Sequence, residues 1–153
     1  MIPVDGKLTI DGLEEHTTVQ QAAQIVGPLT QRRKVSDPVP VDRFYCKQNR
    51  QIRLYTERGH NIVREIHGDS FECNGEVLFR LGASRAEVEG YLGPPEWSTG
   101  GDSRKFNTYR KLGMKAQSIS LMFDDGILTA IAFPWIETVI PGTTMIPANP
   151  LLS

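Results

Sequence analysis

The chain has 153 residues, 39% of them hydrophobic and 23% charged, and its 17 basic and 18 acidic side chains give a formal net charge of -1. This length suits one domain or two small ones. The balanced charge argues against nucleic acid or an anionic membrane as a partner. No apolar run reaches about 18 residues, so we expect no membrane span. The N-terminus lacks the regions of a secretory leader, so we expect a cytoplasmic protein.

Two short segments are predicted to be helices that begin at Thr18 and Ser84. In each, the hydroxyl residue is followed three positions later by Gln21 or Glu87, which is the pattern of a capping box. Each segment ends at Gly-Pro, where glycine allows the helix to end and proline prevents its continuation. Helices of about nine residues are unstable alone, so each must pack on a sheet. The expected buried residues are Val19, Ala22, Ala23 and Val26 in the first helix and Val88, Tyr91 and Leu92 in the second.

Each predicted helix is followed by a predicted antiparallel hairpin. Residues 51–66 align without a gap with residues 118–133, which matches Leu54 with Leu121. Ile119, Leu121 and Phe123 alternate, so they share one face of a strand, and the following Asp-Asp-Gly predicts a turn. The aromatic segments 41–47 and 105–111 predict one further strand before each hairpin, with loops, 99–103 among them, leading from helix to sheet.

The sequence therefore predicts an α+β fold of two αβββ units in tandem, each a short helix packed on an antiparallel sheet. We place the first unit at residues 1–67, the second at 68–135 and an extended proline-rich tail at 136–153. Residues 69–81 predict an additional hairpin with its turn at Asn74-Gly75, and residues 8–12 predict a matching strand before the first helix.

No residue pattern points to catalysis. His16, His60 and His67 fit no metal-ligand spacing, and we expect all three at the surface. The sequence contains no nucleophile motif and no phosphate-binding glycine motif. Cys46 and Cys73 are expected to be free thiols, because no secretory leader precedes them. We therefore predict no catalytic residue, no metal and no cofactor.

The motifs LGASRAEVEGYLGPPEW, at residues 81–97, and YRKLGMKAQSISLMFDDGILTAI, at residues 109–131, carry a family resemblance. They resemble the αβββ unit of the SmpA/OmlA/BamE small outer-membrane lipoproteins. Two such units in tandem are similar to the architecture of β-lactamase inhibitor proteins. The style of the unit also resembles cytosolic immunity proteins that neutralise bacterial toxins. This resemblance implies a non-enzymatic inhibitor whose partner is a protein, either a cognate toxin or an enzyme.

The candidate partner-binding residues lie at hairpin tips, beside the second helix and on the sheet face opposite Leu54 and Leu121. The resemblance implies that a carboxylate at a hairpin tip inserts into a basic pocket of the partner. Partly exposed tryptophans are common anchors at protein interfaces. The candidate residues are Tyr55, Glu57, His60, Trp97, Tyr109, Met122, Asp124, Asp125 and Trp135.

The distribution of charge along the chain indicates which kind of partner the second part suits. Residues 1–67 hold 10 basic and 8 acidic groups, and residues 68–153 hold 7 basic and 10 acidic groups. The second part therefore suits a cationic partner. The basic stretch at residues 31–34 is expected to be a solvated surface. Two alternatives stay open: a structural or assembly scaffold, and a small-molecule-binding or enzymatic cleft between the two units.

Overall fold

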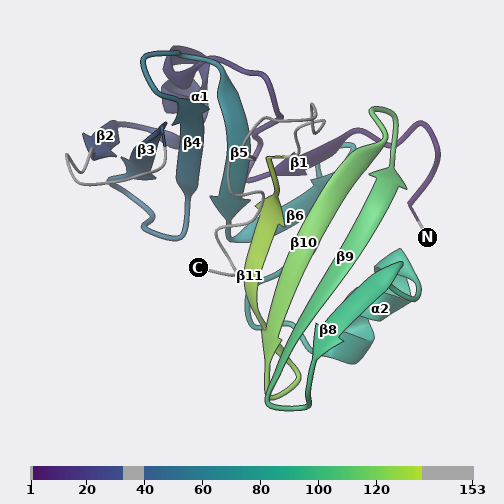
Figure 1. The fold of residues 1–153 in the computed structure, drawn as a ribbon. Coiled ribbons are helices and arrows are strands. Elements are labelled where there is room, and N and C mark those ends of the chain that lie inside the picture. The colour runs from purple at the N-terminus through teal and green to yellow at the C-terminus, as the bar shows by residue number, and fades with distance from the viewer. Residues whose placement is uncertain (1, 33–39, 136–153) are drawn as a thin grey trace, which may run out of the picture.

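The computed structural model describes residues 2–32 and 40–135, and in these residues the chain forms two helices and eleven strands (Figure 1). The helices are α1 (Val19–Val26) and α2 (Arg85–Leu92). The strands are β1 (Leu8–Ile10), β2 (Leu29–Arg32), β3 (Val41–Cys46), β4 (Arg53–Glu57), β5 (Val63–Gly68), β6 (Ser70–Cys73), β7 (Glu76–Arg80), β8 (Trp97–Gly100), β9 (Arg104–Leu112), β10 (Gln117–Asp124) and β11 (Ile127–Phe133). The predicted α+β class is confirmed, whereas the predicted tail lies outside the described residues.

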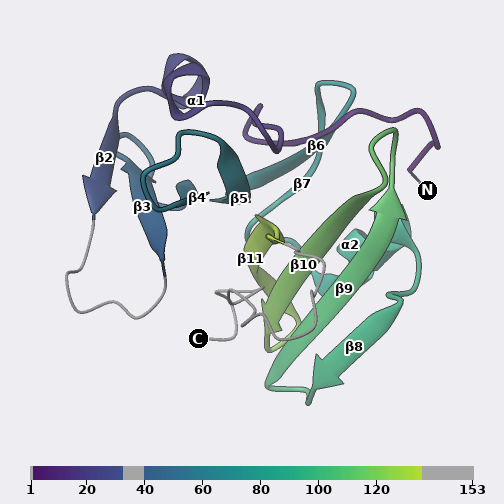
Figure 2. The ribbon, with the colours of Figure 1, turned by 45° about the horizontal axis from the view of Figure 1, so that its top comes forward.

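The strands form two antiparallel sheets. The large sheet has the order β2-β3-β4-β5-β11-β10-β9-β8, and the small sheet has the order β1-β6-β7. We call α1 with β2–β5 the N-terminal half and α2 with β8–β11 the C-terminal half. The last strands of the two halves, β5 and β11, pair antiparallel and join the halves into one continuous sheet (Figures 1 and 2).

Each half contributes four strands to the large sheet where the sequence predicted three, so the prediction missed β2 and β8. Both are edge strands of the large sheet, and their side chains are half-buried or exposed. Because an edge strand needs no alternating apolar side chains to pair its backbone, nothing in its sequence distinguishes it from a loop. The segment expected to be a loop at 99–103 therefore begins within β8.

Both helices begin and end as predicted. The Thr18 Oγ1 atom accepts from the Gln21 backbone N at 3.1 Å, and Gln21 Oε1 accepts from the Thr18 backbone N at 3.0 Å, which completes the capping box. Ser84 Oγ accepts from the Glu87 backbone N at 3.2 Å, but the Glu87 side chain does not accept from the Ser84 backbone N, so the second predicted capping box is only half formed. The chain leaves both helices at a glycine with positive φ, 92° at Gly27 and 80° at Gly93, a conformation that other residues rarely adopt.

The hydrophobic core lies on one face of the large sheet. Ala22 of α1, and Val88 and Leu92 of α2, pack in the same cluster as Leu54 and Leu121 of the sheet. The small sheet closes the cluster through two of its phenylalanines, Phe71 and Phe79. The helices and the small sheet therefore cover one face of the large sheet. The other predicted buried residues lie nearer the margin. Val19 and Val26 are half-buried against the cluster, and Ala23 is half-buried outside it. Tyr91 is 38% exposed, with its ring centre 6.3 Å from that of Phe79.

The two predicted hairpins form, but their lengths differ. Leu54 lies opposite Ile66, whereas Leu121 lies opposite Ile131, so the connection in the N-terminal half is two residues longer. The gapless alignment is therefore wrong beyond the turn, since Asp125 and Gly126, both with positive φ, make a tight turn that the N-terminal half lacks. Each hairpin has a bulge, directly after Tyr55 in one and directly after Met122 in the other.

The segment between the halves also folds as predicted, with β6 and β7 joined at Asn74-Gly75 and β1 paired to β6. Cys46 and Cys73 are free thiols, and both are buried. Among residues 2–32 and 40–135, neither helix combines the length and the apolar character that crossing a membrane requires.

Candidate functional site

The face of the large sheet opposite the core carries a continuous row of cross-strand neighbours. We call this side of the sheet the second face. The row crosses all eight strands, from Thr30 through Tyr45, Arg53, His67, Ala132, Ser120 and Thr108 to Trp97. Its middle is buried at His67 and Ala132, whereas Trp97 at the edge is 61% exposed. The accessible parts of the second face therefore lie toward its two edges.

Trp135 closes part of the second face. Directly after β11, its indole packs against Tyr55 and Val41, and all three side chains are buried. The Trp135 backbone N donates to Glu65 Oε1 at 2.8 Å, and the Arg64 guanidinium carbon lies 5.0 Å from the centre of the indole. Trp135 is therefore a packing residue in this structure and not an exposed anchor. The expectation that Tyr55 lies on an uncovered surface is also wrong.

A buried polar network lies beneath Trp135. His67 Nε2 lies 2.9 Å from Glu65 Oε2, and Arg53 Nη2 lies 3.5 Å from His67 Nδ1. Because a guanidinium can only donate, Nδ1 of His67 must accept, and the ring proton therefore sits on Nε2 and points at Glu65. The expectation that His67 lies at the surface is wrong, because β5 is an interior strand and Tyr55 packs edge-on against the ring at 5.5 Å. Both ring nitrogens of His67 and both carboxylate oxygens of Glu65 have partners, so we regard the His67–Glu65 pair as structural.

Tyr109 has a structural position as well. It lies on the core side of β9, is 2% exposed, and its hydroxyl donates to the Gly93 backbone O at 2.8 Å. Burial, and next the nearby charge of Glu89, raise the pKa of Tyr109 to about 12. This contact fixes the end of α2 to the sheet, and it leaves little of the side chain for a partner to reach.

The candidate residues at the hairpin tips are accessible but lie far apart. His60 and Asp125 are exposed, and Glu57 and Asp124 are partly exposed. Because β5 and β11 pair antiparallel, the two tips point toward opposite ends of the sheet (Figure 1). The carboxylate of Asp124 accepts from Arg104 Nε at 2.7 Å, and this bond holds the pKa of Asp124 below its usual range.

The accessible apolar part of the second face lies in the C-terminal half. Phe106 pairs with Met122 on one side and Thr99 on the other, and both apolar side chains are half-buried. Trp97 lies on the same face at the neighbouring edge strand. We call these four residues with Thr108 the Trp97 patch. Phe106 was not among the predicted residues, because only the pairing of β9 with β10 places it beside Met122.

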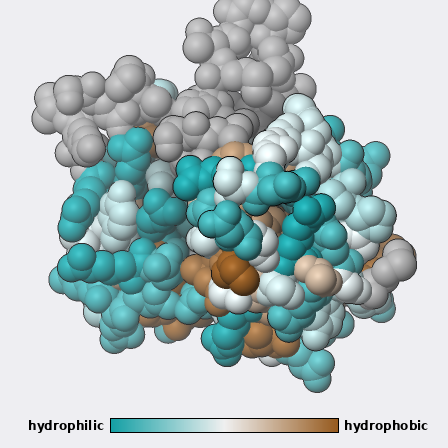
Figure 3. Space-filling view, turned by 90° about the horizontal axis from the view of Figure 1, so that it is seen from below, coloured by the Kyte–Doolittle hydropathy of each residue, from teal (hydrophilic) through white to brown (hydrophobic). Residues whose placement is uncertain are grey.

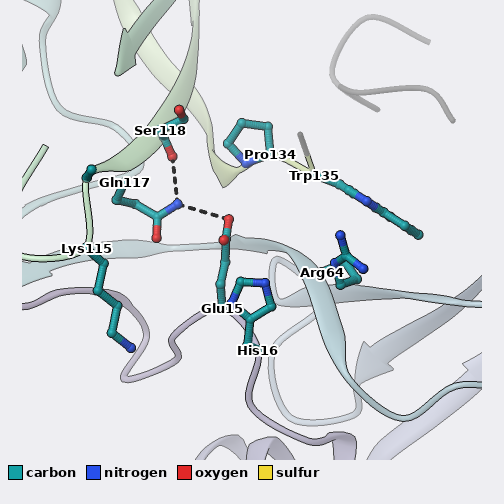
Figure 4. A pocket seen from close by; sticks show the side chains of 9 residues that line it. Glu15, His16, Arg64, Lys115, Gln117, Ser118, Pro134 and Trp135 are labelled. Carbon is teal, nitrogen blue, oxygen red and sulfur yellow. Dashed lines mark hydrogen bonds between the residues drawn. The ribbon is translucent and has the colours of Figure 1, made fainter. Parts of the chain in front are cut away.

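A pocket of about 450 Å³ lies where the two halves meet (Figure 4). Glu15 points into it, and its Oε1 accepts from Gln117 Nε2 at 2.9 Å. Burial raises the pKa of Glu15. His16 lies beside Glu15, and Arg64 lies beside Trp135 on the other side of the pocket. Sequence reasoning left open a cleft between the two units but did not name its residues, because they come from segments that are distant along the chain.

The face of the molecule seen from below in Figure 3 is mostly hydrophilic, and its apolar side chains form small separate patches. Within residues 2–32 and 40–135, no group of three or more His, Cys, Asp or Glu side chains has the arrangement needed to hold a metal ion.

Comparisons with known proteins place the chain in no family. No family model matches the sequence. No curated protein matches it either. A crystal structure from Streptococcus mutans, described as a "putative beta-lactamase inhibitor protein", aligns with 84% of this chain and 88% of its own, at 15% identity and a TM-score of 0.29.

Proposed function

We propose that this protein is a non-enzymatic inhibitor that binds another protein through the Trp97 patch. The observation that carries this proposal is the exposure of Trp97, 61%, beside the half-buried Phe106 and Met122. Aromatic residues and methionine are enriched at protein interfaces, and a few of them supply most of the binding energy. The threonines between them add polar groups that suit the rim of such an interface.

We also propose that the protein is a doubled unit and that it is located in the cytosol. The repeated order of one helix and four strands, the glycine at both helix ends and the bulge after Tyr55 and Met122 support a doubled unit, each an αβββ core with an added edge strand. Two buried free cysteines suit a reducing compartment. We therefore propose a cytosolic immunity protein that neutralises a toxin or an enzyme.

The test is binding to the product of a neighbouring gene. We expect the two proteins to co-purify and to form a tight complex, and Trp97→Ala to weaken it by about 2 kcal/mol or more. Tyr91→Ala is the matched control, because Tyr91 is also an exposed aromatic residue but lies on α2, on the opposite side of the sheet. Equal affinity of the Trp97 variant and the wild type would remove the Trp97 patch from the interface. Absence of any complex would refute the inhibitor function.

A second candidate function is the binding of a small molecule at the junction of the halves. The observation that favours it is Glu15, a carboxyl group with a raised pKa that faces a pocket of about 450 Å³. A fragment screen by NMR tests it, with Glu15→Gln expected to abolish any hit and Glu14→Gln, at the neighbouring position, to leave it unchanged. The scaffold alternative instead predicts higher-order self-association, which light scattering detects.

A further inference from the structure

A basic pocket of about 580 Å³ lies in the N-terminal half, at the edge of the large sheet. Among the described residues that line it, four are cationic and none is acidic. Arg32 comes from the end of β2, Arg53 from the start of β4, and Lys47 and Arg50 from the connection between β3 and β4. The pocket is separate from both sites described above, since it shares no lining residue with either.

The pairing of three strands assembles this pocket. Tyr45 of β3 lies opposite Thr30 of β2 on one side and Arg53 of β4 on the other. The connection that carries Lys47 and Arg50 is held by backbone hydrogen bonds, from Lys47 N to Pro28 O at 3.0 Å and from Ile52 N to Asn49 O at 3.1 Å. The backbone that presents these two cations is therefore fixed before any ligand arrives.

Within the described part of the chain, these four positive charges have no acidic partner. Within residues 2–32 and 40–135, no ion pair involves any of the four cationic residues. The Arg32 guanidinium lies 5.2 Å from the centre of the Tyr45 ring, and Arg53 contacts the His67 imidazole. Like charges gathered around one concave surface repel each other, and they focus a positive potential into it. A bound anion offsets this repulsion.

We propose that the basic pocket binds a ligand that carries several adjacent anionic oxygens. Four cations exceed what a single carboxylate needs, so a multiply charged group fits better. Arginine matches phosphate and carboxylate groups with two parallel hydrogen bonds, and lysine adds a point charge. Thr30 and Gln51 line the same pocket and supply neutral donors. Its volume lies in the range of small-ligand sites, about 300–1,000 Å³.

The ligand group has two possible sources, a free phosphorylated molecule or an acidic segment of a protein. The experiment titrates the full chain with pyrophosphate in one arm and with a hexaglutamate peptide in the other. Calorimetry measures affinity, and potassium chloride keeps the ionic strength constant. We expect saturable binding in at least one arm, and the tighter arm identifies the source. No saturable binding in either arm would overturn the proposal.

Two double variants test whether the anion binds in this pocket or is attracted only by the positive charge of the surface as a whole. Arg50→Gln combined with Lys47→Gln should weaken binding by at least about tenfold, because both positions donate directly to the anion. The matched control is Arg110→Gln with Lys111→Gln, two exposed cations on β9 in the C-terminal half, which removes the same charge. Equal loss in both double variants would overturn the proposal. Thermal unfolding checks that all variants fold, and the test needs no protein partner, so it stands apart from the proposed inhibitor function.

Discussion

Each half of the large sheet contributes four antiparallel strands, but the two halves present different chemistry on the second face. In the N-terminal half, Tyr45 and Arg53 lie beside other cations, whereas the corresponding strands of the C-terminal half carry Thr108 and Ser120 in the row that ends at Trp97. Turns, caps and the core face set the path of the backbone. The residues between them point to the other face, so they can differ without changing the fold.

The two halves also differ in how their charged side chains are arranged. Counts along the chain favour a cationic partner for the acidic second part. The structure instead concentrates positive charge in the basic pocket of the N-terminal half, and it pairs Asp124 of the C-terminal half with Arg104. The spatial distribution of charge, not its count along the chain, therefore indicates which partner each half suits.

The largest expected effect compares matched core residues of the two halves. Leu54 and Leu121 are both fully buried in one cluster, so Leu54→Ala and Leu121→Ala should each lower the free energy of unfolding by about 2–5 kcal/mol. Urea unfolding followed by circular dichroism should show one cooperative transition that shifts in both variants. Two separate transitions, with only one shifted by each variant, would show that the halves fold independently.

A smaller effect concerns the buried pair of His67 and Glu65 in the N-terminal half. In the row of the second face, His67 lies opposite Ala132 of the C-terminal half. His67→Leu leaves Glu65 Oε2 without its donor, so we expect a loss of about 1–3 kcal/mol in unfolding free energy. Adding Glu65→Gln should recover part of the loss, since a neutral amide still accepts from Trp135. No recovery would indicate that packing, not the unpaired charge, causes the loss.

Replacing the capping residue of each helix by alanine should lower the free energy of unfolding by about 0.5–2 kcal/mol. Thr18→Ala removes only one of the two capping-box bonds, because the backbone N of residue 18 still donates to Gln21 Oε1. Ser84→Ala removes the bond from the Glu87 backbone N and leaves no second capping bond at that helix end, so the Ser84 variant should lose more stability. Chemical denaturation measures both. Thr18→Asn should restore most of the stability, because asparagine is also a good cap; equal losses at the two positions would contradict the comparison.

The smallest expected effects are pH-dependent changes in stability. They should have opposite signs for substitutions of Glu15 and of its neighbour Glu14. Burial raises the pKa of Glu15 above its ordinary value of 4.5, so the folded protein loses stability as pH rises through that range. Glu15→Gln should therefore be slightly more stable than the wild type at neutral pH and equal to it well below pH 4.5. Thermal unfolding across this range measures the difference.

Glu14 is the control for this prediction. Hydrogen bonds from Lys115 and Lys7 hold the pKa of Glu14 below its ordinary value, so its contribution is present at neutral pH and is lost as pH falls. Glu14→Gln should therefore be slightly less stable than the wild type at neutral pH. A shift of the same sign in both variants would contradict the different environments of the two carboxyls.

The sequence by itself determined the local features of this protein. The capped helices at Thr18 and Ser84, the alternation of Ile119, Leu121 and Phe123 and the turns at Asn74 and Asp125 each depend on residues close together in the chain. For the same reason, the faces of the central strands could be assigned in advance, and so could the position of Met122 on the second face.

Only the tertiary structure shows which of these helices, strands and turns contact one another. The pairing of β5 with β11, the edge strands β2 and β8 and the burial of His67 and Trp135 depend on contacts between distant segments. The Trp97 patch, the junction pocket and the basic pocket arise in the same way. The alternation of side chains in a strand predicts which face of the sheet each residue lies on. It does not predict which strand will be the neighbour, because strands pair through backbone groups that nearly all residues share.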